Sequence, residues 1–263
     1  MTGAPLETLL RRDRAIVLAA LAAVTALAWA YLAWSGGQHG TDGAMAGMDM
    51  ASPGLVAWSA ADFLLMFLMW AVMMIGMMTP SVAPMLLIYS RVARHANQRA
   101  QPFAATGWFA AGYLLAWAVF AAAATLLQWL LERAALMTPA MALASKPLGG
   151  ALLVAAGLYQ WTPLKDACLG QCRSPFQFIQ SRGGFRSDRR GSIRLGLEHG
   201  AFCIGCCWAL TLLLFLFGVM NLLWIAALAA LVLVEKAFRG GRYVARASGV
   251  LFIVAGIALI AAS

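Results

Sequence analysis

Residues 60–86 read AADFLLMFLMWAVMMIGMMTPSVAPML, and this stretch contains one ionisable side chain, Asp62, close to its start. An apolar run of this length crosses the roughly 30 Å hydrocarbon core of a bilayer as one α-helix, because about 20 residues suffice. The rest of the chain has the same character, since 63% of its residues are hydrophobic and only 11% are charged. Lipid is therefore the expected solvent, and we predict a single integral membrane domain over residues 1–263.

Six further apolar runs accompany this one. The predicted transmembrane helices cover residues 15–34, 60–86, 103–131, 148–164, 197–218, 220–235 and 244–262. The first run follows Arg11, Arg12 and Arg14 as the apolar part of a signal peptide would, but it is too long for that role and lacks a convincing cleavage site. We predict an all-α fold, a polytopic bundle of about seven transmembrane helices.

The basic residues are divided unequally between the two sides of such a bundle. All but two of the 19 Lys and Arg residues precede the first span or lie in 87–102, 165–196 and 236–246, and the exceptions are Arg133 and Lys146. The positive-inside rule then predicts a cytoplasmic N-terminus and a periplasmic C-terminus for a multi-pass protein of the bacterial inner membrane. Because the charge lies in short segments between apolar runs, we expect membrane lipids as its partner and no nucleic acid.

This orientation places the two longest connections. Residues 35–59 are expected to form a flexible, Gly-rich periplasmic loop, and residues 165–196 a basic cytoplasmic loop. All five cysteines then fall on or near the reducing side, where structural disulfides are rare. Sulfur and imidazole donors in the periplasmic loop are His39, Met45, Met48 and Met50.

One helical face near the start of the fifth predicted span carries an imidazole and three thiols. With 3.6 residues per turn, His199, Cys203, Cys206 and Cys207 lie within about 100° of one another. Cys168 and Cys172 are four residues apart and also share a face where the chain is helical. Buried cysteine can be a small apolar filler, but two clusters at one depth favour a metal site at the cytoplasmic face. Its predicted ligands are Cys168, Cys172, His199, Cys203, Cys206 and Cys207.

The methionines favour one metal over others. Thiolates suit Cu(I), Zn(II) and iron–sulfur clusters, whereas thioethers suit Cu(I) far better than Zn(II). Six of the 13 residues from 66 to 78 are methionine, and Met66, Met69, Met73 and Met77 form one stripe on a helix. We predict Cu(I) as the metal, with zinc as the alternative, and a path along Met69, Met73 and Met77. Packing in an irregular core is the other interpretation of this stripe.

Other residues near the predicted membrane boundary receive simpler interpretations. Pro80 and Pro84 should bend the second span near its end. We expect Glu235 and Lys236 to pair at the interface first, with a role beside the metal site second. Glu198 lies off the His199 face and is expected to pair with arginines of the preceding loop.

Three features of the sequence resemble a known bacterial family. They are the motifs TPLKDACLGQCRSP at 162–175 and GAFCIGCCW at 200–208, and the methionine-rich span that ends at Pro80. It is a family of metal-binding integral membrane proteins, catalogued as domain of unknown function 2182 and sometimes linked to copper. The resemblance runs from about residue 60 to the end of the chain. It implies the fold and metal binding and leaves the activity open.

The leading hypothesis is a Cu(I)-binding protein that translocates or delivers copper across the inner membrane. Copper would be accepted by the periplasmic Met/His loop, passed along the methionine stripe, held at the Cys/His site and exchanged with a cytosolic or periplasmic copper chaperone. The absence of a P-loop motif argues against an ATP-driven step, and no enzymatic activity is expected. Two alternatives stay open: a non-transporting assembly or sensor protein for a membrane cuproenzyme, and a membrane thiol-redox enzyme.

Overall fold

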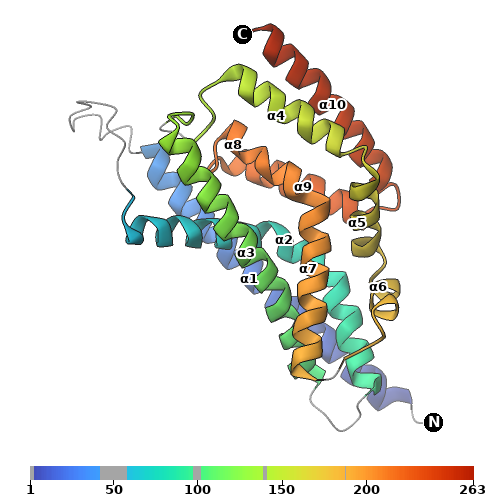
Figure 1. Cartoon of the computed structure of the whole chain (residues 1–263). Helices are drawn as coiled ribbons and strands as arrows, with labels where there is room; N and C mark the ends of the chain where they lie inside the picture. The colour runs from blue at the N-terminus through green and yellow to red at the C-terminus, as the bar shows by residue number, and fades with distance from the viewer. Residues whose placement is uncertain (1–2, 42–57, 97–101, 139–140, 187) are drawn as a thin grey trace.

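The computed structural model describes residues 3–41, 58–96, 102–138, 141–186 and 188–263, and within these the chain is helical apart from turns and one isolated β-bridge (Figure 1). The predicted all-α class is confirmed. The helices are α1 (Gly3–Thr41), α2 (Ala60–Ala96), α3 (Pro102–Arg133), α4 (Lys146–Tyr159), α5 (Pro163–Arg173), α6 (Pro175–Ser181), α7 (Arg189–Leu212), α8 (Leu214–Phe217), α9 (Leu222–Ala237) and α10 (Gly241–Ala261).

Among the described residues, five helical segments are long and apolar enough to cross a membrane. They are Arg14–Ser35, Ala60–Val92, Ala105–Arg133, Arg189–Phe217 and Gly241–Ala261. The two remaining predicted spans, 148–164 and 220–235, coincide with α4 and α9, which have 14 and 16 residues. At 1.5 Å per residue these helices are about 21 and 24 Å long, shorter than a hydrocarbon core of about 30 Å.

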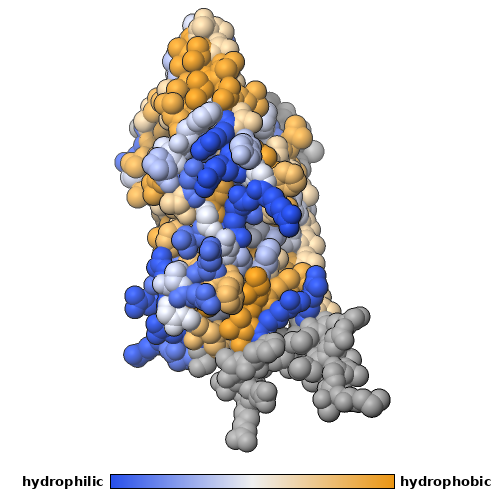
Figure 2. All heavy atoms as spheres, turned by 90° about the vertical axis from the view of Figure 1, so that its right-hand side faces the viewer, coloured by the Kyte–Doolittle hydropathy of each residue, from blue (hydrophilic) through white to orange (hydrophobic). Residues whose placement is uncertain are grey.

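The outer surfaces of the membrane-length helices are apolar. On α10, Leu251 and Val254 are exposed, and on α1 so are Leu27 and Trp34. Figure 2 shows hydrophobic surface over the upper part of the molecule, where α4 and α10 lie, and polar residues gathered lower on the same face. Exposed apolar side chains in contiguous bands are typical of helices that face lipid.

Two predicted loops differ from the structure. Residues 35–41, predicted as loop, continue α1, while 42–57 of the same loop lie outside the described residues. The predicted basic loop 165–196 is largely helical, because it contains most of α5, all of α6 and the start of α7.

Local signals explain these helices within the predicted loop. The hydroxyl of Thr162 caps α5, with Pro163 in its first turn, and a carboxylate oxygen of Asp188 accepts from the Gly191 backbone N–H at 2.7 Å to cap α7. Such caps and N-terminal prolines fix helix starts. α2 remains one helix through Pro80 and Pro84, and its second half runs in a new direction in Figure 1, as a proline bend requires.

Glycines let two helix pairs approach backbone to backbone. Between α3 and α7, a Cβ on Gly196 would overlap the carbonyl of Phe109, and a Cβ on Gly112 would overlap the carbonyl of Ile193. Between α4 and α10, Gly150 faces Gly256 and Gly157 faces Gly249 in the same reciprocal way. Small residues at helix crossings are how apolar helices pack closely in lipid, where no hydrophobic effect drives them together.

The Gly196→Ala variant tests this packing. Its new Cβ has no room against the α3 backbone, so we expect unfolding to become easier by about 1–3 kcal/mol, seen as a lower thermal midpoint in detergent. Gly107→Ala on α3 is the matched control, because a Cβ there meets no atom within 4 Å. The control should leave the midpoint unchanged or raise it slightly. Equal midpoints for both variants would contradict the close approach.

Candidate metal centre

The three cysteines of α7 are buried at the centre of the protein. Cys203, Cys206 and Cys207 are each at most 2% exposed. The thiols of Cys206 and Cys207 donate hydrogen bonds to the backbone carbonyl of Cys203, at 3.0 and 2.9 Å. The i, i+3, i+4 spacing therefore puts these thiols on one face of the helix, as its periodicity predicts.

α5 brings the other two cysteines to this face. The thiol of Cys172 is hydrogen-bonded to Cys203 and Cys206, and these bonds raise the pKa of Cys172 above the ordinary thiol value. The Cys168 sulfur lies against Gly205, where an added Cβ would come within 2.7 Å of it, and burial raises the pKa of Cys168. Both effects disfavour the thiolate form of the α5 cysteines, so a metal bound there would displace protons.

The ligand atoms are gathered but not oriented around one point. Within the residues described, no group of three or more His, Cys, Asp and Glu side chains has the arrangement of a metal site. Two thiols point to the Cys203 carbonyl instead. Binding of one ion by Cys172, Cys206 and Cys207 would displace the thiol protons that make these hydrogen bonds.

A buried lysine lies at the same cluster. Lys236 of α9 is 8% exposed, and its Nζ donates to the Cys203 sulfur at 2.9 Å and to the Ser81 hydroxyl of α2 at 3.2 Å. The Tyr113 hydroxyl of α3 lies 3.2 Å from the same sulfur. Cys203 is thus the point where α2, α3, α7 and α9 meet, with positive charge placed where a thiolate would form.

The predicted interface pairing of Glu235 with Lys236 is wrong. Glu235 instead pairs with Lys165 of α5, with 2.6 Å between carboxylate oxygen and ammonium, and it accepts a 2.8 Å hydrogen bond from Gln160. Both charged groups of this ion pair are almost completely buried. Adjacent residues of a helix point about 100° apart, so Glu235 and Lys236 reach different neighbours. The expected pairing of Glu198 with loop arginines is confirmed by Arg182 and Arg194.

The thiol cluster lies near the middle of the apolar segment that contains it. The apolar span containing it runs from Arg189 to Phe217, and Cys203 lies roughly 21 Å from its start, about half way. The prediction of a site at the cytoplasmic end of this span assumed a helix beginning at residue 197. The helix begins eight residues earlier, at Arg189, and the side of the membrane on which the site lies stays a prediction.

His199 packs one turn before the cysteines in an aromatic enclosure. Its ring lies 5.0 Å from Phe178, 5.9 Å from Phe109 and 6.0 Å from Tyr113, measured between ring centroids. The residue is 3% exposed, and its Nδ1 has no hydrogen-bond partner within the described chain. A buried nitrogen without a partner is costly and is chemically suited to accept a soft metal ion.

The methionine stripe of α2 faces the protein and not the surface. Met69, Met73 and Met77 are 6%, 0% and 2% exposed. Ser81, the Lys236 partner, follows Met77 by one turn, so the stripe ends beside the thiol cluster. At the other end, the amide of Gln128 donates to the Met66 sulfur at 3.4 Å. The side chain of His39 and the residues Met45, Met48 and Met50 lie outside what the structure describes.

Sequence reasoning missed several polar residues around this centre. Tyr113, Gln160 and Lys165 are buried, and each makes a hydrogen bond or ion pair to α7, α9 or α10. Tyr159 also donates to the backbone carbonyl of Gly205. Their positions could have indicated this role, because an ionisable or amide side chain near the end of an apolar run in a membrane protein usually has a polar partner within the protein.

Fold and site together define a class: an all-helical chain with membrane-length apolar helices that enclose a cluster of thiols. The sequence matches the PpoB2 family, described as copper chaperone, over residues 67–259. The chain belongs to this family of copper chaperones. No curated protein and no solved structure is detectably similar to the chain. The copper link of the resemblance is thereby supported, while the label domain of unknown function 2182 stays a prediction.

The convergence of α5 and α7 can be tested by disulfide formation. In a variant that keeps only Cys172 and Cys203, with the other three cysteines changed to serine, mild oxidation should give an internal disulfide, detected by mass spectrometry of peptides. A variant keeping only Cys168 and Cys203 is the control, because Cys168 lies against Gly205. Faster oxidation of the control pair would contradict the arrangement.

Proposed function

We propose that this protein binds Cu(I) at the buried cysteine cluster and delivers it to a partner protein, with translocation across the inner membrane as part of the route. The observation that carries the proposal is the packing of α5 against α7, which places the Cys168 sulfur against Gly205 and brings Cys172 to the side of Cys203 and Cys206. Sulfur ligands from two separate helices can close around one ion. The proposed ligands are Cys168, Cys172, His199, Cys203, Cys206 and Cys207.

Ligand chemistry favours Cu(I) over zinc. Thiolates and thioethers are soft donors, and Cu(I) accepts both, whereas Zn(II) uses thiolate and imidazole but rarely thioether. Membership of a copper chaperone family supports the same metal. Two or three thiolates around a monovalent ion leave net negative charge, and the Lys236 ammonium, 2.9 Å from Cys203, would offset part of it.

We propose that copper reaches the cluster along α2. Met69, Met73 and Met77 form a buried row that ends one turn before Ser81, beside Lys236 and Cys203. A row of thioethers enclosed by protein offers weak, repeated binding to a soft cation and keeps the ion out of lipid. The proposed collecting ligands on the periplasmic side are His39, Met45, Met48 and Met50.

The proposed topology has seven crossings, with the N-terminus in the cytoplasm and the C-terminus in the periplasm. The uneven distribution of Lys and Arg supports this orientation. α4 and α9 would supply the two short crossings, and local thinning of the bilayer allows helices of their length to cross. A site half way along α7 would then be reached from either side through protein.

Delivery without transport is the second candidate, and the family's description as copper chaperones favours it. In that case the protein loads a membrane or periplasmic cuproenzyme and moves no net copper across the bilayer. Uptake of copper into proteoliposomes separates the two: transport predicts copper accumulation inside vesicles, and delivery alone predicts binding without accumulation.

Removing the thiols should remove the copper. We expect the variant with Cys168, Cys172, Cys203, Cys206 and Cys207 all changed to serine to bind Cu(I) at least about 100-fold more weakly, since hydroxyl is a poor ligand for a soft ion. Competition with a Cu(I) chelator measures the affinity, and metal analysis gives the stoichiometry. Thermal unfolding shows that the variant is folded. Stoichiometric copper in the folded variant would refute the proposed site.

The methionine row should govern rate and not affinity. We expect the triple variant Met69→Leu, Met73→Leu and Met77→Leu to keep the equilibrium affinity of the thiols for Cu(I) and to slow copper loading by about tenfold. The change removes the thioether ligands of the path while leucine keeps the packing volume. Stopped-flow transfer from a Cu(I)–chelator complex measures the rate. The single variant Met85→Leu is the control, because Met85 lies on α2 beyond Ser81 and outside the proposed path. An unchanged rate in the triple variant would assign the row to packing.

A further inference from the structure

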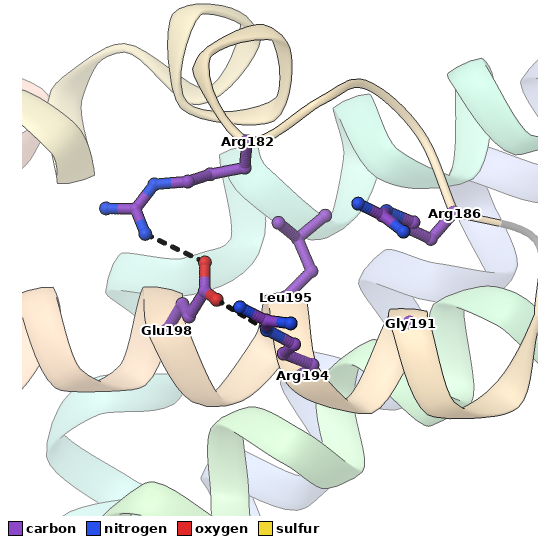
Figure 3. A pocket seen from close by; sticks show the side chains of 6 residues that line it. All are labelled: Arg182, Arg186, Gly191, Arg194, Leu195 and Glu198. Atoms are coloured by element: carbon purple, nitrogen blue, oxygen red, sulfur yellow. Dashed lines mark hydrogen bonds and ion pairs between the residues drawn. The ribbon is translucent and has the colours of Figure 1, made fainter.

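A basic pocket opens between the segment that follows α6 and the first turns of α7 (Figure 3). Its volume is about 160 Å³. The residues around it are Arg182, Arg186, Gly191, Arg194, Leu195 and Glu198. Three guanidinium groups thus surround one carboxylate, and the pocket carries two more positive charges than negative ones.

The three arginines are not equivalent. Arg182 and Arg194 both pair with Glu198, at 2.9 and 3.0 Å. Arg182 is also held over the rings of Phe178 and Phe202, which fixes its direction. The guanidinium of Arg186 extends toward the Leu195 side chain in Figure 3 and has no acceptor within the described chain. An anion in the pocket would find one unpaired guanidinium and two already positioned beside it.

The pocket lies where the apolar part of the protein begins. The pocket-lining residues of α7 lie in the first turns of the membrane-length segment Arg189–Phe217, where basic residues give way to apolar ones such as Leu195. Phe176 of α6 is 57% exposed, and the Arg189 guanidinium lies 4.2 Å from the centroid of the Trp108 ring. Aromatic side chains beside basic ones are typical of the level of lipid headgroups.

We propose that this pocket binds the phosphate of an anionic phospholipid. The fork geometry of guanidinium matches phosphate oxygens, and the volume suits one phosphate group and not the broad face of an acidic protein. Glu198 keeps Arg182 and Arg194 in position without cancelling the net charge. This lipid site goes beyond the proposed copper function and does not depend on it.

The test compares lipid retention by matched variants of the full-length protein. After purification in mild detergent, protein is incubated with phosphatidylglycerol or phosphatidylcholine, and bound lipid is counted by native mass spectrometry alongside the thermal midpoint. We expect one phosphatidylglycerol to be retained and the midpoint to rise by a few degrees, with no rise for phosphatidylcholine. Arg186→Gln should weaken retention at least about fivefold, and Arg186→Lys by less, since lysine keeps charge but not the fork.

Arg190→Gln is the control. It removes the same charge from the same segment, and Arg190 is exposed and does not line the pocket. An equal loss of lipid in this variant would overturn the site in favour of general surface charge. An equal rise of the thermal midpoint with inorganic phosphate would show that the pocket binds free phosphate and would overturn the phospholipid as the ligand. Unchanged lipid retention in Arg186→Gln, with loss of binding to an acidic copper chaperone, would assign the pocket to a protein partner.

Discussion

The ammonium of Lys236 is buried and therefore has to find partners inside the protein, because an uncompensated charge in an apolar interior costs several kcal/mol. Its partners are the sulfur of Cys203 on α7 and the hydroxyl of Ser81 on α2. The preceding residue, Glu235, reaches Lys165 on α5. Two consecutive residues at the end of α9 thus hold α2, α5 and α7 together, and the thiol cluster lies where these helices meet.

This constraint gives the cysteines unequal roles. Cys203 has the ammonium of Lys236, the hydroxyl of Tyr113 and the thiol of Cys172 around its sulfur, so negative charge is best accommodated there. The thiols of Cys206 and Cys207 donate hydrogen bonds to a backbone carbonyl instead. Under the proposed function, Cys203 is the first ligand that copper meets from α2, and the others close around it.

Helical periodicity and ligand chemistry predicted much of this arrangement from sequence. The shared face of Cys203, Cys206 and Cys207 and the pairing of Glu198 with Arg194 follow from spacing along one helix. The contacts of Glu235 and Lys236 did not follow, because they depend on which helix lies opposite, and spacing along the chain carries no such information. The helices within 165–196 were missed although Thr162, Pro163 and Asp188 are ordinary start signals, since charge density outweighed capping in that interpretation.

Under the proposed function, the burial of the cluster limits how copper can leave it. Cys168, Cys203, Cys206 and Cys207 are buried, whereas Cys172 is only partly so. Cys172 also belongs to α5, outside the membrane-length helices, and lies next to Arg173, whose guanidinium is exposed and bonded to backbone carbonyls after α9. Copper exchange between thiolates needs an incoming sulfur to reach the ion before an outgoing one departs. Of the five cysteines, Cys172 is the one in a residue that is only partly buried, so under the proposed function it is the ligand placed to make that exchange with a partner.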